Sequence, residues 1–214
     1  KDAVSLLEYY GEIGSTNQRA KQWAVEGAPH GSAVVAARQT QGQGRRGRNF
    51  LSPDGGVYLS IVLRPSSMPS SAEPVLITTA AAVAVAQTIE EVCGPEHKMS
   101  IKWVNDLFFG KKKVCGILTE GITDMESGTI SALVVGIGVN FSTPPTAFPP
   151  ELQVIAGSLY DSSSHVPTGI NRSLFAARII AAVIDIAAHL GEEWIWQYYR
   201  SRSILLGRGV TVES

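Results

Sequence analysis

The chain has 214 residues, and its 44% of hydrophobic residues is enough to fill the core of one generous domain. Its formal net charge of -1 argues against a protein that coats nucleic acid, because such proteins are strongly basic. The longest apolar stretch, residues 75–89, is interrupted by polar residues and is too short to span a bilayer, so no membrane segment is expected.

The N-terminal part is expected to alternate helix and strand. Ser15, Thr16 and Asn17 can cap a helix that runs through residues 20–26 and ends at Gly27. Residues 32–38, rich in Val and Ala, predict a buried strand. Residues 57–63 alternate as a second strand does, and residues 65–71 read as a polar linker. The segment between these two strands, which contains residues 42–48, therefore follows directly on the end of a strand.

The middle of the chain predicts a long helix and a hairpin. Residues 73–93 are rich in Ala and carry little charge, which indicates a buried helix. Residues 100–104 predict a strand, and residues 107–116 a hairpin whose returning strand covers residues 114–120. The hairpin tip, residues 110–113, contains three lysines, which we interpret as a solvated turn.

Residues 129–140 predict a further, very apolar strand, followed by a Pro-rich loop over residues 142–150. Residues 173–199 predict one amphipathic helix, with two tryptophans near its end that we interpret as packing residues. Residues 209–214 resemble the start of a new strand. The order of the elements predicts an α+β fold, a mixed β-sheet with helices packed against it.

The segment 42–48, GQGRRGR, which we call the arginine loop, is the most informative part of the chain. It places three glycines and three arginines in one turn-forming stretch. Glycine lets a ligand approach the backbone closely, and each arginine offers a charged fork for phosphate or carboxylate oxygens. The stretch also fits the dinucleotide motif GxGxxG, but Pro53 and the glycines behind it disfavour the helix that this motif requires. The remaining interpretation is that this segment binds an anion.

Cysteine and histidine usage excludes some site classes. Cys93 and Cys115 lie in apolar or strand-like surroundings without metal-type spacing, which favours free thiols in a reducing compartment such as the cytoplasm. The four histidines are scattered without the spacing of zinc ligands and receive no role.

Four segments, taken together, carry a family resemblance: residues 15–17, Gln39 with the arginine loop, KWVND at 102–106, and GIGVN at 136–140. Their order and chemistry resemble the catalytic domain of biotin protein ligases, whose hallmarks are a GRGRxGR loop, a KWPND strand end, a following GIL and a glycine-rich strand that closes on Asn. The match spans nearly the whole chain. It departs from the family at Gln43, commonly Arg, and at Val104, where the family has proline.

The resemblance implies a fold like that of class II aminoacyl-tRNA synthetases and biotin synthetases over residues 1–206, with residues 207–214 as the start of a truncated C-terminal β-domain. It also implies a two-step reaction. The biotin carboxylate attacks the α-phosphate of ATP, with Mg²⁺ present, to form biotinyl-5′-AMP, and a lysine of a biotin carboxyl carrier domain takes the biotinyl group. No counterpart of a DNA-binding domain is expected, and the family includes homodimers.

The resemblance also implies roles for individual residues. Lys102 matches the lysine that bridges the biotin carboxylate and the α-phosphate, and Arg45 matches the arginine that retains the adenylate. The implied biotin-binding residues are Ser15, Thr16, Asn17, Gln39, Gln43, Gly44, Arg45, Lys102 and Gly116. The implied ATP-binding residues are Arg45, Arg48, Phe50, Lys102, Asn105 and Asn140.

Some roles stay open on the sequence alone. Ser15 to Asn17 can act as a helix cap as well as a ligand set, and Asn140 can contact adenine or finish a turn. Asp106 can help to place Mg²⁺ or cap the strand end. Arg46 is expected to face solvent.

Two rival functions also remain open. One is a lipoate ligase or octanoyltransferase, which shares the catalytic fold. The other is a non-enzymatic module whose arginine loop grips the phosphates of a nucleic acid.

Overall fold

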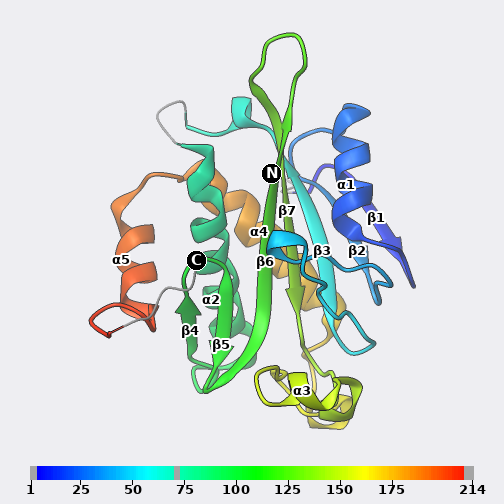
Figure 1. Cartoon of the computed structure of the whole chain (residues 1–214), viewed down its shortest axis with the longest axis vertical. Helices are drawn as coiled ribbons and strands as arrows, with labels where there is room; N and C mark the ends of the chain where they lie inside the picture. Colours follow the sequence, from blue (N-terminus) through cyan, green and yellow to red (C-terminus); the bar gives the residue numbers. More distant parts are fainter. Residues whose placement is uncertain (1–3, 70–72, 210–214) are drawn as a thin grey trace.

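The structure, a computed structural model, describes residues 4–69 and 73–209. Within these residues the chain forms a seven-stranded sheet in the order β1-β2-β3-β7-β6-β5-β4 (Figure 1). β1 runs parallel to β2 and all other neighbours pair antiparallel, so the sheet is mixed. The predicted α+β fold is confirmed.

The strands are β1 (Leu7–Tyr10), β2 (Ser32–Ala36), β3 (Val57–Leu63), β4 (Met99–Lys102), β5 (Asp106–Phe109), β6 (Lys112–Thr123) and β7 (Ile130–Val139). The α-helices are α1 (Thr16–Val25), α2 (Ile77–Cys93), α3 (Pro150–Gln153), α4 (Arg172–Ala188) and α5 (Glu193–Arg202). In the part of the chain that the structure describes, no helix is long and apolar enough to cross a membrane.

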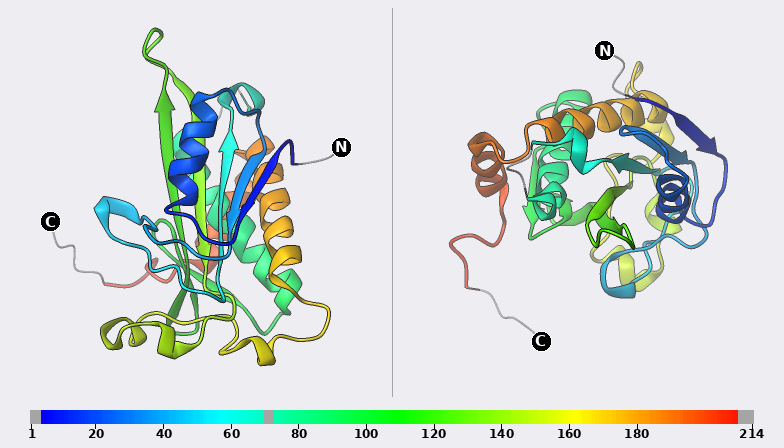
Figure 2. Two further views of the ribbon diagram at one scale, coloured as in Figure 1. Left: turned by 90° about the vertical axis from the view of Figure 1, so that its right-hand side faces the viewer. Right: turned by 90° about the horizontal axis from the view of Figure 1, so that it is seen from above.

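The two faces of the sheet are covered unequally. Leu59 and Ile137, with their alternate neighbours in β3 and β7, pack with α2 and α4 in the main core. On the opposite face Val62 and Val134 pack with Ala20 and Ala24 of α1 in a smaller core. The left view of Figure 2 shows α1 and α4 on opposite sides of the sheet. Because α1 has 10 residues and α2 and α4 have 17 each, the α1 face is left partly open.

Several sequence predictions are confirmed and others are wrong. β3 lies at the predicted residues, and α1 begins after Ser15 as the capping pattern predicted. The edge strand β1 was missed, because its burial alternates weakly between exposed and half-buried positions. The single helix predicted over residues 173–199 is two helices, since Gly191 adopts a φ of 102° between α4 and α5. The strand predicted at 209–214 falls mainly on residues 210–214, which lie outside the described residues.

The main core predicts one matched pair of stability effects. Phe175 is fully buried, with its ring centroid 5.0 Å from that of Phe141, whereas its neighbour Leu174 is 42% exposed. We expect Phe175→Ala to lower the free energy of unfolding by about 3–5 kcal/mol, because it leaves a cavity in the core. We expect Leu174→Ala to change it by roughly 0.5 kcal/mol or less. Urea unfolding measures both values, and equal losses would contradict this description of the core.

Candidate functional site

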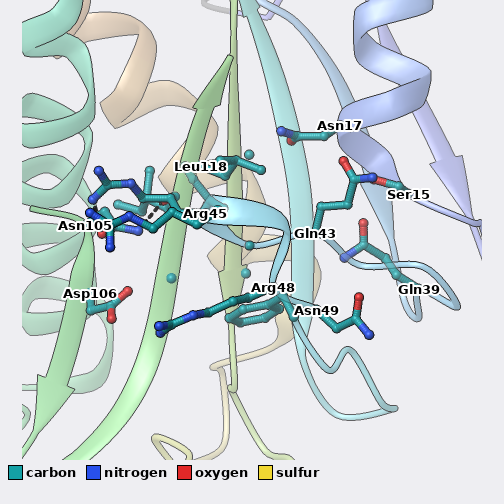
Figure 3. Close-up of a pocket in the computed structure, with 18 of the residues that line it drawn as sticks. Ser15, Asn17, Gln39, Gln43, Arg45, Arg48, Asn49, Asn105, Asp106 and Leu118 are labelled. Atoms are coloured by element: carbon teal, nitrogen blue, oxygen red, sulfur yellow. Dashed lines mark hydrogen bonds between the residues drawn. The ribbon is translucent and has the colours of Figure 1, made fainter. Parts of the chain in front are cut away.

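A cavity of about 430 Å³ opens on the α1 face of the sheet. Its volume lies within the range of small-molecule sites, roughly 300–1,000 Å³. The residues that line it come from the N-terminus of α1, the arginine loop, the turn between β4 and β5, and strands β6 and β7 (Figure 3). Every site residue predicted from the sequence lines this cavity except Lys102 and Asn140.

Three glycines form the floor of the cavity. Gly116 of β6 pairs with Gly138 of β7, and Gly136 lies two residues earlier on the same face of β7. A Cβ at Gly138 would overlap the ring of Phe50, and one at Gly116 would lie 2.9 Å from that ring. A Cβ at Gly136 would overlap the side-chain amide of Asn17. The glycines of β7 therefore make room for the Phe50 ring and the Asn17 amide, which line the cavity.

The end of the cavity next to α1 is polar and uncharged. The backbone N–H of Thr16 donates to Gln39 Oε1 at 2.8 Å, and the Thr16 hydroxyl lies 3.0 Å from the same oxygen. Gln39 Nε2 in turn donates to the hydroxyl of Ser52 at 2.9 Å. Ser15 caps α1, since its hydroxyl accepts from the backbone N–H of Gln18. Capping and cavity lining therefore coexist at Ser15.

Two residues support this end from outside the cavity lining, and the sequence did not reveal their part in the site. The hydroxyl of Ser60, a fully buried residue of β3, lies 2.6 Å from Asn17 Oδ1 and 2.8 Å from the Thr16 hydroxyl. Asn17 Nδ2 donates to the carboxylate of Glu120 on β6 at 2.8 Å. A serine or glutamate inside a strand pattern carries no signal of its own, so only the three-dimensional structure brings these groups together.

The opposite end of the cavity is cationic. The arginine loop crosses from the end of β2 toward the turn between β4 and β5, and Arg45 donates to Asn105 Oδ1 at 3.2 Å (Figure 3). Asn105 is itself fixed, because its Nδ2 donates to the backbone carbonyl of Ile117 at 2.7 Å. Arg48 also lines the cavity. Arg46, expected to face solvent, is exposed with a φ of 57° but lies at the cavity rim as well.

The lysine in the cavity is Lys113 and not Lys102. Lys113 Nζ lies 2.7 Å from Asp106 Oδ1 and 6.0 Å from the centroid of the Phe50 ring. Lys102 pairs with Asp106 in register, so both are on the same face of the sheet, but Lys102 belongs to the outer strand β4 and is exposed. Lys102, which the resemblance implies as the bridging lysine, therefore does not line the cavity.

A β-bulge explains why Lys113 was interpreted as part of a solvated turn. Leu107 pairs with Cys115 and Phe108 with Lys113, so Val114 is an extra residue in β6. Val114 and Cys115 are both buried in the main core, and the extra residue returns Lys113 to the cavity face. Two consecutive buried residues interrupt the alternation of a strand, and this was the signal in the sequence.

Asn140, the other predicted residue outside the cavity, holds the loop that follows β7. Its Nδ2 donates to the carbonyl of Gly157 at 2.9 Å, and its backbone N–H donates to the carbonyl of Val114 at 2.8 Å. Asn140 could either contact adenine or finish a turn, and the geometry favours the second role.

Comparison with known proteins shows which family and which individual proteins this chain is similar to. Residues 11–140 match the model of the biotin/lipoate A/B protein ligase family. The chain is similar to the bifunctional ligase/repressor BirA of Bacillus subtilis, with 43% identity over 154 residues that cover 72% of this chain and 46% of that protein. It is also similar to the biotin–[acetyl-CoA-carboxylase] ligase of Mycobacterium tuberculosis, with 28% identity over 97% of this chain and 74% of that protein.

The chain is also similar to proteins of known structure. The biotin protein ligase of Aquifex aeolicus, in complex with biotin and ATP, superimposes with a TM-score of 0.74 at 29% identity, over 95% of this chain and 80% of that one. The chain spans about half the length of several of the curated relatives that it matches.

Proposed function

The chain belongs to the biotin/lipoate A/B protein ligase family, and from this membership we propose that it is a biotin protein ligase. In the first step a biotin carboxylate oxygen attacks the α-phosphorus of ATP, and pyrophosphate leaves to give biotinyl-5′-AMP. In the second step the amine of a carrier lysine attacks the acyl carbon of this adenylate. AMP leaves, the amine loses a proton, and an amide joins biotin to the carrier domain.

One observation carries the proposal: a single cavity has an uncharged polar end and a cationic end. Biotin has the same division, with a neutral ureido ring at one end and a carboxylate at the other. We assign the ring to the end formed by Ser15 to Asn17 and Gln39, and the carboxylate to the end formed by Lys113 and Arg45. Gln43, Gly44 and Gly116 line the same cavity and are assigned to biotin as well.

Fixed positive charge is what the first step needs, because an anionic nucleophile meets an anionic phosphate. Lys113 and Arg45 neutralise the carboxylate and the α-phosphate, and the loop arginine Arg45 then retains the adenylate. Arg48, Phe50 and Asn105 are the groups assigned to ATP. No covalent protein nucleophile is required.

Mg²⁺ is proposed to arrive with ATP. Asp106 supplies a carboxylate to the cavity, while the described residues contain no group of three His, Cys, Asp or Glu able to hold a metal ion. This fits an ion that is held by Asp106 together with phosphate oxygens. Bound Mg²⁺ would neutralise phosphate charge there.

The proposed partner is a biotin carboxyl carrier domain of a biotin-dependent carboxylase. The proposed compartment is the cytoplasm, and two buried free thiols, Cys93 and Cys115, support a reducing environment. Burial raises the pKa of both thiols, so neither is activated for disulfide exchange.

Exchange of labelled pyrophosphate into ATP tests the proposed first step. We expect exchange that depends on biotin. Exchange with lipoate or octanoate in its place would support the lipoate ligase alternative. Binding of RNA or DNA that weakens steeply with salt, without exchange, would support a phosphate-binding module instead.

Arg45→Gly is expected to loosen the hold on the adenylate. The variant should still form biotinyl-AMP, but the adenylate should escape and biotinylate exposed lysines of a protein without a carrier domain, such as lysozyme. Arg46→Gly is the matched control, since it removes the same charge from the same loop at a φ of 57° that glycine adopts readily. Equal labelling of lysozyme by both variants would remove the retention role from Arg45.

A further inference from the structure

Glu120 of β6 connects the cavity to a charged pair outside it. Glu120 Oε2 accepts from Asn17 Nδ2 at 2.8 Å, and Glu120 Oε1 lies 2.7 Å from Lys21 Nζ on α1. Asn17 is only 5% exposed and lies directly over Gly136. The Asn17 side chain, which extends from α1, therefore contacts both β6 and β7.

This contact decides which way the Asn17 amide points. A carboxylate can only accept hydrogen bonds, so it fixes the Nδ2 group of Asn17 on its own side. The Oδ1 atom must then face the hydroxyl of Ser60, 2.6 Å away. With the amide rotated by half a turn, Oδ1 would face the carboxylate of Glu120 and both atoms would be acceptors.

With Asn17 in this orientation, the polar end of the cavity holds more acceptors than donors. Three contacts between oxygens lie in a row: Ser60 to Asn17, Ser60 to Thr16, and Thr16 to Gln39. Only the two hydroxyl groups of Ser60 and Thr16 carry protons for them. Gln39 Oε1 is also paired with the backbone N–H of Thr16, so each of these oxygens has a partner. Asn17 Oδ1, for which Ser60 is the donor, keeps a second lone pair that an N–H group of a ligand can use.

From these contacts we propose that Glu120 is a positioning residue that makes the cavity selective for an N–H-donating, urea-type head group over an apolar ring. This inference rests on the proposed function and deepens it. The ureido ring of biotin donates two N–H groups, whereas the dithiolane ring of lipoate donates none. A site built to accept hydrogen bonds from the N–H groups of a ligand discriminates strongly against a ligand that cannot donate them.

Three variants test the role of Glu120. Glu120→Ala should raise the Kd for biotin by roughly 10- to 100-fold, the cost of losing a hydrogen bond to a charged group, and leave the Kd for ATP unchanged. Glu120→Gln should recover most of the affinity, because its amide oxygen can still accept from Asn17 Nδ2. Lys21→Ala is the control, since it removes the half-buried ion pair but keeps the contact with Asn17, and it should change the Kd by less than about threefold.

A double-mutant cycle separates positioning from a general structural effect. If Glu120 acts through Asn17, then Glu120→Ala should change the Kd for biotin very little in an Asn17→Ala background. The same loss in both backgrounds would overturn the proposal, as would an unchanged Kd in the single Glu120→Ala variant. A wild-type protein that does not bind biotin would instead refute the proposed function, so the two failures are distinct.

Discussion

Lys113→Ala is expected to reduce biotin-dependent pyrophosphate exchange by roughly 10²- to 10³-fold, the usual cost of removing one group that stabilises developing charge. Lys113 is the lysine that lines the cavity, and its Nζ atom lies 2.7 Å from Asp106 Oδ1. A compact ammonium group can follow negative charge as it moves between the biotin carboxylate and the phosphate. The fold should be unaffected, because Lys113 is outside the core. Exchange measured at saturating biotin and ATP isolates this effect.

Lys102→Ala provides the matched control for Lys113→Ala. Both lysines lie on the same face of the sheet, but Lys102 is exposed on the outer strand β4 and does not line the cavity. We expect exchange within about threefold of the wild-type rate. A collapse of exchange in Lys102→Ala, with normal exchange in Lys113→Ala, would restore the assignment based on the sequence and refute the structural one.

Gly136→Ala is expected to abolish detectable biotin binding and to lower the free energy of unfolding by about 1–3 kcal/mol, the usual range for overpacking. The added methyl group would overlap Asn17 Oδ1, and Asn17 cannot withdraw without losing its contacts with Ser60 and Glu120. One methyl group should therefore displace the polar end of the cavity. Calorimetry with biotin and urea unfolding measure the two effects.

Gly121→Ala is the control for Gly136→Ala in the same sheet. A Cβ at Gly121 would lie 3.9 Å from the nearest atom of Ile130, which is ordinary van der Waals contact. We expect biotin binding and stability close to those of the wild type. If Gly136→Ala were equally harmless, the cavity floor would not be the biotin site.

The sequence predicted most of the fold because local patterns and tertiary structure agree there. β3 alternates cleanly, and Ser15 offers a cap at a helix start that the structure uses. The helix break at Gly191 was missed because the apolar pattern continues across a single glycine. β1 was missed because an edge strand buries little, so its pattern is weak.

The candidate site was predicted in its loops and only partly in its strands. The arginine loop and residues 15–17 can be recognised in the sequence by their composition, and the structure brings them together at one cavity. Lys113 was assigned to a turn because a one-residue bulge reverses the face that it occupies, and the only sign of this bulge in the sequence is the pair of consecutive apolar residues Val114 and Cys115. Glu120 acts through a contact with Asn17, 103 residues earlier, which no local pattern encodes.

Calorimetric titration of the wild-type protein with biotin and with lipoate tests the central claim most directly, that a cavity with an acceptor-rich end and a cationic end is built for biotin. We predict that biotin binds with a Kd at least roughly 100-fold lower than that of lipoate, because the ring of lipoate has no N–H group to donate to the acceptor oxygens of the polar end. Tight binding of lipoate without measurable binding of biotin would contradict the account.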